Sequence, residues 1–285
     1  MILSMTGFGK AEVQLENKTI SIELRSLNSK SADINARIPS YLKELETAFR
    51  KKLSSRLHRG KMDLYIHLEF VNGISPMSIN TPVVKHYIEQ LKSFDQDTDT
   101  DVLGIAMRLP DALYNQKEEL SQEEIHPIND LFSKVLDQLE KHRSDEGAAL
   151  AKDFLVRLDM IEKLLKKVIE IDPERSQKVK KKLRTALEDL NVATDANRFE
   201  QELIYYLEKY DITEEKVRLQ NHINYFKDVM NEAAPNGKKL GFIAQEMGRE
   251  INTIGSKANH AELQKIVVQM KDELEKIKEQ LLNVL

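Results

Sequence analysis

The chain has 285 residues and carries 47 acidic and 43 basic side chains, for a formal net charge of −4, with no cysteine and no tryptophan. The absence of cysteine excludes disulfide bonds, thiol nucleophiles and cysteine-based zinc sites. The N-terminus lacks the basic start and apolar core of a signal peptide, and no apolar run approaches the ~20 residues of a membrane helix. We therefore expect a cytoplasmic protein outside the membrane, long enough for two domains with full cores.

Residues 1–72 show the period-two alternation of β-strands in the stretches EVQLE, TISIELRSL and MDLYIHLEF. Between these stretches a helix is predicted from residue 41 to 57, with Ser40 after Pro39 as its N-cap. Its apolar residues recur at intervals of three and four: Leu42, Leu45, Phe49, Leu53 and Leu57. This segment is therefore expected to form a small β-rich α+β module.

After the linker VNGISPMS, every following segment is predicted to be helical. The helices are expected near residues 80–95, 101–118, 127–170, 174–190, 196–209, 211–233, 238–251 and 259–283. The predicted fold class is thus α+β, with a small N-terminal module followed by a predominantly helical region of long helices. We expect three domains, at residues 1–72, 73–195 and 196–285.

The final helix carries a heptad pattern with charged flanks. Its apolar residues alternate steps of four and three: Leu263, Val267, Met270, Leu274, Ile277, Leu281 and Val284. Asn259 and Glu262 resemble a capping box at its start. The pattern predicts packing either on the 127–170 helix of the same subunit or on another chain, and both remain open.

The stretch from 235 to 258, PNGKKLGFIAQEMGREINTIGSKA, predicts an amphipathic helix that runs into a polar turn, NTIGSK. The buried face contains Leu240, Ile243, Met247 and Ile251. Glu246 and Glu250 lie four residues apart and repel each other by about 0.2–0.5 kcal/mol, a cost that a bound cation would turn into binding. Together with Arg249 and Lys257, this composition suits chemistry on a phosphate. The alternative is a solvated helix face on which Arg249 neutralises both carboxylates.

A second polar stripe lies in DITEEKVRLQNHINYF, residues 211–226, where Glu214, Arg218 and His222 follow one another at steps of four. His222 is the best candidate for a proton carrier, because histidine changes its charge near neutral pH. Much of the motif also has a structural explanation, since Asp211 can cap the helix and Glu214 can pair with Arg218.

Two basic segments offer positive charge to a polyanion despite the negative net charge. Residues 50–61, RKKLSSRLHRGK, contain one histidine, no acid and six basic residues: Arg50, Lys51, Lys52, Arg56, Arg59 and Lys61. The region 163–184 is also basic, and a solvated helix face accounts for it readily. Because no acidic residue dilutes the first segment, we expect it to contact nucleic acid, with an affinity that falls steeply with salt.

Five blocks of the chain resemble the YicC/YloC family of bacterial proteins. QEMGREINTIGSK resembles the family's QEMNREANT-SK, while MILSMTGFGKAE and IELRSLNSKSADINARIP resemble its MTGFGRA and LRSVN-D-RLP. RSDEGAAL, DITEEKVRLQNHI and KEQLLNVL resemble its R-EG-L, D-TEE-RL-SH and REQ-QN. The blocks lie in family order and span nearly all of the chain. Three positions depart from the pattern: Gly241 where Asp is common, Gly248 where Asn is frequent, and Lys278 where Arg is usual.

The resemblance implies an endoribonuclease that needs a divalent metal, Mn²⁺ or Mg²⁺, and assembles as a ring-like homo-oligomer. We predict that the two polar helices face each other around an RNA phosphodiester, which is hydrolysed or transesterified. The predicted metal ligands are Glu214, Glu215, Glu246 and Glu250, since both ions prefer oxygen ligands. The predicted catalytic residues are Arg218, His222, Glu246, Arg249 and Glu250. RNA contacts are predicted for Asn252, Thr253, Ser256 and Lys257 and for the basic segment of the first domain, which we also expect to take part in assembly.

Two other functions are compatible with the same residues. A non-catalytic RNA-binding adaptor that presents transcripts to a separate nuclease would use the basic segments without a metal. A helical scaffold would use the heptad pattern for assembly and the polar faces as subunit contacts. The chain lacks a Walker-type glycine loop, which argues against a nucleotide-driven motor.

Overall fold

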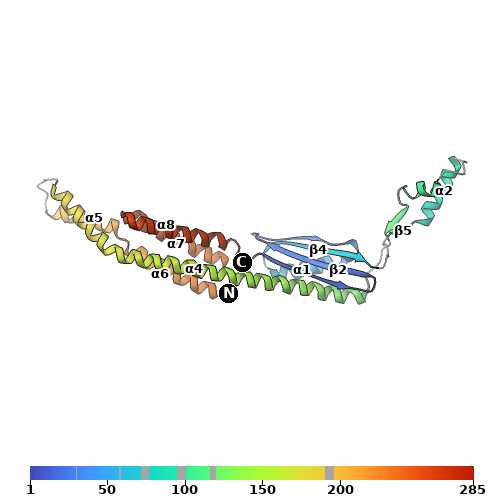
Figure 1. Cartoon of the computed structure of the whole chain (residues 1–285), viewed down its shortest axis with the longest axis horizontal. Coiled ribbons are helices and arrows are strands. Elements are labelled where there is room, and N and C mark those ends of the chain that lie inside the picture. The colour runs from blue at the N-terminus through green and yellow to red at the C-terminus, as the bar shows by residue number, and fades with distance from the viewer. Residues whose placement is uncertain (30, 58, 72–76, 95–100, 116–119, 190–195) are drawn as a thin grey trace. The chain divides into compact units, whose positions relative to one another are not determined.

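The structure is a computed structural model that describes residues 1–285 except 30, 58, 72–76, 95–100, 116–119 and 190–195 (Figure 1). It contains two compact units, each built from stretches far apart in the sequence. Unit 1 consists of Met1–Gly7, Leu27–Lys30 and Glu140–Leu285, and unit 2 consists of Phe8–Ser26 and Ser31–Leu139. Unit 1 is mainly helical and unit 2 contains a sheet with helices, which confirms the predicted α+β class.

Unit 2 is built on a four-stranded sheet. Its strands are β1 (Gly7–Gln14), β2 (Lys18–Leu27), β3 (Ala32–Arg37) and β4 (Gly60–Phe70), in the order β1-β2-β4-β3. β3 and β4 run parallel, with Ala32 opposite Gly60 and Arg37 opposite Tyr65. Successive residues of β2 and β4 alternate between buried and more exposed positions, as the period-two pattern predicts.

Three helical segments pack with the sheet in its hydrophobic core: η1 (Ser40–Leu45), α1 (Glu46–Leu57) and the first part of α4 (Gln122–Asp189). The apolar residues predicted for the 41–57 helix are all buried, and Phe49 stacks on Phe132 with ring centres 4.1 Å apart. The predicted N-cap is wrong. Ser40 is already the first residue of η1, and Pro39 before it has no side-chain acceptor, so no side chain caps this end.

The expectation that everything after the linker is helical is wrong within residues 77–115. This region contains β5 (Met77–Ile79), α2 (Thr81–Phe94), α3 (Val102–Ala106) and β6 (Leu113–Asn115). β5 and β6 pair antiparallel, so within residues 101–115 the predicted 101–118 helix is limited to α3, and its last three residues lie outside the described part of the chain. Pro110 lacks the backbone N–H that a continuing helix needs, and Asp111 turns the chain with a φ of 59°.

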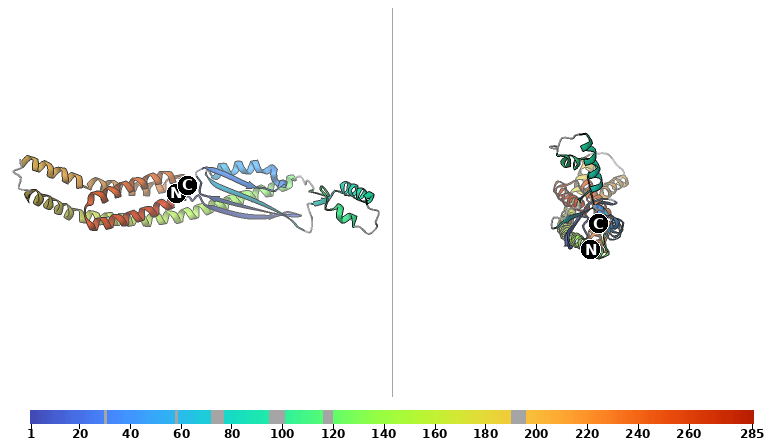
Figure 2. Two further views of the ribbon diagram at one scale, coloured as in Figure 1. Left: turned by 90° about the horizontal axis from the view of Figure 1, so that it is seen from above. Right: turned by 90° about the vertical axis from the view of Figure 1, so that its right-hand side faces the viewer.

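Unit 1 packs four helices around one core. The second part of α4 lies beside α6 (Thr213–Asn231), α7 (Gly237–Ala258) and α8 (Ala261–Leu281), and α5 (Ala196–Tyr210) extends beyond them (Figure 2). Every residue of the heptad pattern is buried in this core. The pattern therefore serves packing within the chain, against α7 and in a core to which α4 also contributes. No helix in the described ranges combines the length and apolarity needed to cross a membrane.

Helix α4 runs unbroken through Pro173, where the sequence predicts a break between two helices. The proline is exposed, so the carbonyl of Ile169 that loses its helical partner can bond to water. The neighbouring Asp172 and Arg175 are buried in a polar network described below. Packing on both sides of the proline therefore overrides the tendency of proline to break a helix.

The N-terminal segment of unit 1 is held between α4 and the C-terminus (Figure 2). The Ser4 N–H donates to the Arg143 carbonyl at 3.0 Å and the Met5 N–H to the Asn283 carbonyl at 2.8 Å. A Cβ at Gly147 would lie 2.3 Å from the Ile2 carbonyl oxygen. The opening block, the RSDEGAAL block and the closing block thus meet in one place.

Candidate functional site on the α6–α7 hairpin

Helices α6 and α7 carry most of the predicted site residues and form an antiparallel hairpin. Two contacts on one side of the hairpin fix its register. Lys257 Nζ donates to Glu215 Oε1 at 2.7 Å, and the Lys239 ammonium lies 5.2 Å from the centre of the Tyr225 ring. The two helices pack against each other as predicted, while the arrangement of their polar faces around a phosphodiester stays a prediction.

His222 and Glu250 lie on the two helices of the hairpin, within the stretch bounded by these two contacts. The His222 side chain is half-buried, and Glu250 is buried.

A continuous surface follows this side of the hairpin, because its members recur at steps of three and four on each helix. All of them are exposed or half-buried. We call this surface the α6–α7 face; it comprises Glu214, Arg218, His222 and Tyr225 of α6 and Phe242, Glu246, Arg249, Thr253 and Lys257 of α7.

Two exposed ion pairs lie on the α6–α7 face. Arg218 pairs with Glu214 at 2.8 Å, and Arg249 pairs with Glu246 at 3.0 Å. Exposed pairs of this kind contribute about 0–1 kcal/mol, because water competes for both charges. A phosphate can therefore replace either carboxylate as the partner of an arginine at little cost.

The described residues of one chain do not form a metal site. Among them, no group of three or more His, Asp or Glu side chains is placed to hold a metal ion. The glutamates predicted as ligands have separate environments, with Glu214 and Glu246 paired to arginines of their own helices and Glu215 paired to Lys257. Glu215 Oε2 is buried without a hydrogen-bond partner, while the other oxygen of this carboxylate is paired with Lys257.

The NTIGSK segment is helical, so the predicted polar turn is wrong. α7 continues to Ala258 and ends at Asn259, which has a φ of 38°. The Thr253 and Ser256 hydroxyls donate to carbonyls of their own helix, both at 3.0 Å. The predicted Asn259–Glu262 capping box is also wrong, because Asn259 closes α7 and His260 caps α8 instead.

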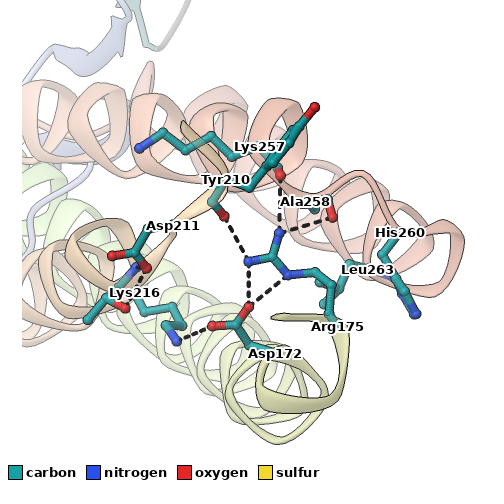
Figure 3. A network of polar contacts seen from close by, with 10 residues as sticks. Asp172, Arg175, Tyr210, Asp211, Lys216, Lys257, Ala258, His260 and Leu263 are labelled. Atoms are coloured by element: carbon teal, nitrogen blue, oxygen red, sulfur yellow. Dashed lines mark hydrogen bonds and ion pairs between the residues drawn. The ribbon is translucent and has the colours of Figure 1, made fainter. Parts of the chain in front are cut away.

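A buried polar network explains why α7 extends so far (Figure 3). The Arg175 guanidinium donates to the carbonyls of Lys257 and Ala258, each at 3.2 Å, and to the Tyr210 carbonyl at 2.8 Å. It thereby satisfies carbonyls at the C-terminal end of α7, where a cation is favourable. Arg175 and Asp172 are ion-paired at 2.7 Å.

This network includes residues that the sequence analysis missed. Lys216 Nζ donates to Asp172 Oδ2 at 2.7 Å, which ties α6 to α4. Arg175 belongs to the 163–184 region that the sequence assigns to a solvated face, but it is buried. The acid–proline–acid–arginine order at 172–175 within a basic helix is the signal that marks it.

Asp211 lies at the start of α6, though it is not the N-cap that the sequence predicts. The N-cap position is Ile212. Asp211 instead accepts hydrogen bonds from the Thr213 hydroxyl at 2.7 Å and the Thr213 N–H at 3.0 Å. These bonds favour the carboxylate and hold the pKa of Asp211 below its usual value.

The basic segment 50–61 is not a uniform basic surface, because acids from elsewhere in unit 2 reach it. Arg50 pairs with Glu46 at 2.8 Å and Arg56 with Asp137 at 2.9 Å, while Lys52 donates to Asn129 at 3.2 Å. Arg59 is half-buried, and Lys51 and Lys61 are exposed. His58 lies outside the described residues. The predicted RNA contacts of this segment stay a prediction.

The fold and this face define a class: a two-unit α+β protein with a helical hairpin that carries exposed, ion-paired arginines. The family of the chain follows from comparison with known proteins. Residues 168–285 match the family model "Endoribonuclease YicC-like, C-terminal", and residues 2–152 match "Endoribonuclease YicC-like, N-terminal region". The chain belongs to the YicC-like endoribonuclease family, which confirms the resemblance in the sequence.

Two curated relatives match over their whole length. A protein of Clostridioides difficile named probable endoribonuclease YicC is 34% identical over 295 residues, covering 100% of both chains. A protein of Haemophilus influenzae with the same name is 28% identical over 290 residues, again covering 100% of both.

Proposed function

We propose that this chain is an endoribonuclease that binds and cleaves RNA on the α6–α7 face. The names of the family and of both relatives support the reaction. The observation that carries the choice of site is the arrangement of this face. A half-buried imidazole, His222, lies one helical turn from Arg218 on α6, and Arg218 and Arg249 are each ion-paired with a carboxylate of their own helix.

In this proposal Arg218 and Arg249 bind the non-bridging oxygens of the scissile phosphate. A guanidinium matches two phosphate oxygens with parallel N–H donors, and these bonds strengthen as negative charge grows in the transition state. Glu214 and Glu246 release the arginines at little cost, as argued above. Asn252 and Lys257, further along α7, contact neighbouring parts of the RNA.

His222 is proposed as the general base. It accepts the proton of the attacking hydroxyl, supplied by water or by the ribose 2′ position, while that oxygen forms its bond to phosphorus. The bond from phosphorus to the leaving ribose oxygen breaks, and this oxygen takes up a proton from water. Glu250, buried on α7, is proposed as a residue that positions the reacting groups. The ends of the product distinguish the two attacking groups.

A requirement for Mn²⁺ or Mg²⁺ and assembly into a ring-like homo-oligomer are proposed from the family resemblance alone. The described residues of one chain do not form a set of metal ligands. The roles proposed for Arg218, Arg249 and His222 are therefore stated without a metal ion. Cleavage measured with EDTA, Mg²⁺ and Mn²⁺ tests the first expectation. The mass of the particle in solution tests the second.

The decisive experiment is cleavage of a labelled structured RNA by the purified full chain, beside His222→Gln and the double variant Glu246→Gln/Glu250→Gln. We expect internal cuts by the natural chain and a loss of about 10²–10⁴-fold in rate for His222→Gln. His67→Gln, an exposed histidine of β4, is the matched control and should cleave normally. A folded His222→Gln protein that cleaves at the full rate would remove this face as the active site. RNA binding without cleavage under any metal would favour the adaptor function instead.

A further inference from the structure

Lys257 is held differently from the arginines of the α6–α7 face. Arg218 and Arg249 each pair with an exposed carboxylate of their own helix. Lys257, in the last turn of α7, donates instead to Glu215 of α6 at 2.7 Å, and the side chain of Glu215 is only 9% exposed. An ion pair that joins two helices and has one buried partner is more than a surface pair that water replaces easily.

The backbone of Lys257 is fixed as well. The last turn of a helix has carbonyls without intrahelical donors, so it tends to fray. Here the guanidinium of Arg175, buried on α4, donates to the carbonyls of Lys257 and Ala258, each at 3.2 Å (Figure 3). Lys257 is therefore held by its carbonyl and by its ammonium, while its side chain stays 32% exposed.

Glu215 is a costly residue for the fold alone. Its Oε1 accepts from Lys257, but its Oε2 is buried and finds no hydrogen-bond partner among the residues that the structure describes. A buried acceptor without a partner is unfavourable, and an apolar side chain of similar size at this helix contact would avoid the cost. A local cost of this kind is expected where a residue serves function, and what Glu215 holds is the ammonium of Lys257.

We infer that Glu215 is a positioning residue for RNA binding, which fixes the Lys257 ammonium on the α6–α7 face before RNA arrives. This inference rests on the proposed function, in which Lys257 contacts RNA beside the scissile phosphate. Without Glu215 the lysine side chain would lose its rotational freedom only on binding, and this cost would weaken the complex. The ammonium carries three N–H donors, so those not used by Glu215 can bind a phosphate.

The sign of the effect separates this role from simple electrostatics. A carboxylate near RNA repels phosphates, so its neutralisation should strengthen binding unless the carboxylate positions a cation. Glu215→Gln should therefore weaken RNA binding, by about threefold to tenfold. The matched control is Glu214→Gln, because the exposed carboxylate of Glu214 only competes with RNA for Arg218. This control should bind RNA at least as tightly as the parent.

The experiment measures the affinity of a fluorescent RNA for full chains that carry His222→Gln to keep the RNA intact, at several salt concentrations, with and without Mg²⁺. Glu215→Gln should lower the affinity without changing the salt slope, because the charge of Lys257 remains. Lys257→Gln should lower the affinity and make the slope shallower by about one unit. The double variant should bind like Lys257→Gln alone, because Glu215 acts through Lys257.

Cleavage kinetics give a second readout in chains that retain His222. Glu215→Gln should raise KM by the same factor and leave kcat unchanged, since Lys257 binds RNA away from the reacting phosphate. The thermal midpoint of each variant checks folding. Glu215→Asp is the second variant, because its shorter side chain draws the carboxylate away from Lys257 but keeps the charge. It should show the same loss of affinity.

Three results would overturn the inference: folded Glu215 variants that bind RNA as tightly as the parent or more tightly, a loss that adds to that of Lys257→Gln, or a loss that occurs only with Mg²⁺. The proposed function stands in each case if the natural protein cleaves RNA. Natural protein that neither binds nor cleaves any RNA overturns both.

Discussion

A buried arginine beside the α6–α7 hairpin and the exposed arginines on it act in opposite ways. Arg175 of α4, at the C-terminal end of α7, is 2% exposed and bonds to three backbone carbonyls and one carboxylate. On the α6–α7 face the side chains of Arg218 and Arg249 are 58% and 75% exposed, and each pairs with a carboxylate of its own helix. Burial, and not residue type, therefore separates the arginine that holds the fold from the arginines that are available to a ligand.

Arg175→Ala should show the largest effect on stability. The substitution removes a cation that balances the charge of the buried Asp172 carboxylate, and it removes the hydrogen-bond donor to three carbonyls. We therefore expect a loss of about 3–5 kcal/mol in the free energy of unfolding. Denaturation by urea measures this loss. Arg218→Ala is the control and should change the same quantity by less than about 1 kcal/mol. Equal effects of the two substitutions would refute the distinction between these regions.

Substitution of the exposed arginines should have the converse result. Arg218→Gln or Arg249→Gln should leave stability nearly unchanged but lower the affinity for RNA by about tenfold to a hundredfold, because each removes a charge-assisted bond to phosphate. The slope of log affinity against log salt should become shallower by about one unit for each arginine. Arg25→Gln breaks the ion pair between Arg25 and Glu23 in unit 2. This substitution should change neither the affinity for RNA nor the salt slope. A salt slope that does not respond to Arg218 or Arg249 would mean that RNA does not contact this face.

Local periodicity predicts those parts of the fold in which burial follows the spacing of apolar residues. The helix at 41–57 and the heptad residues of α8 belong to this group, because each repeats an apolar residue once per turn. Contacts between distant segments decide the remainder. β5 and β6 pair across residues that are far apart in the chain, and α4 passes Pro173 because packing holds it on both sides. No local pattern carries that information.

The same distinction applies to the candidate site: local spacing predicts some of its features, and contacts between helices decide the others. Steps of four on one helix correctly align Glu214, Arg218 and His222 on one side of α6. The same reasoning cannot tell that Glu215 and Glu250 are buried whereas Glu214 is exposed, because burial depends on the partner helix. It also cannot tell whether carboxylates of two helices converge. The proposed metal ligands are therefore the part of the prediction that most needs the experiment with EDTA.

The smallest expected effect concerns Gly241, a glycine inside α7. A Cβ added there would meet nothing within 4 Å, and glycine inside a helix costs about 0.5–1 kcal/mol relative to alanine. Gly241→Ala should therefore raise the free energy of unfolding by about that amount without changing the rate of RNA cleavage. Gly147→Ala is the contrasting control, since its Cβ would lie 2.3 Å from the Ile2 carbonyl oxygen and should cost about 1–3 kcal/mol through overpacking. If Gly241→Ala stabilises the fold but slows cleavage, then α7 needs flexibility at this point, and the α6–α7 face acts by moving and not only by holding its charges in place.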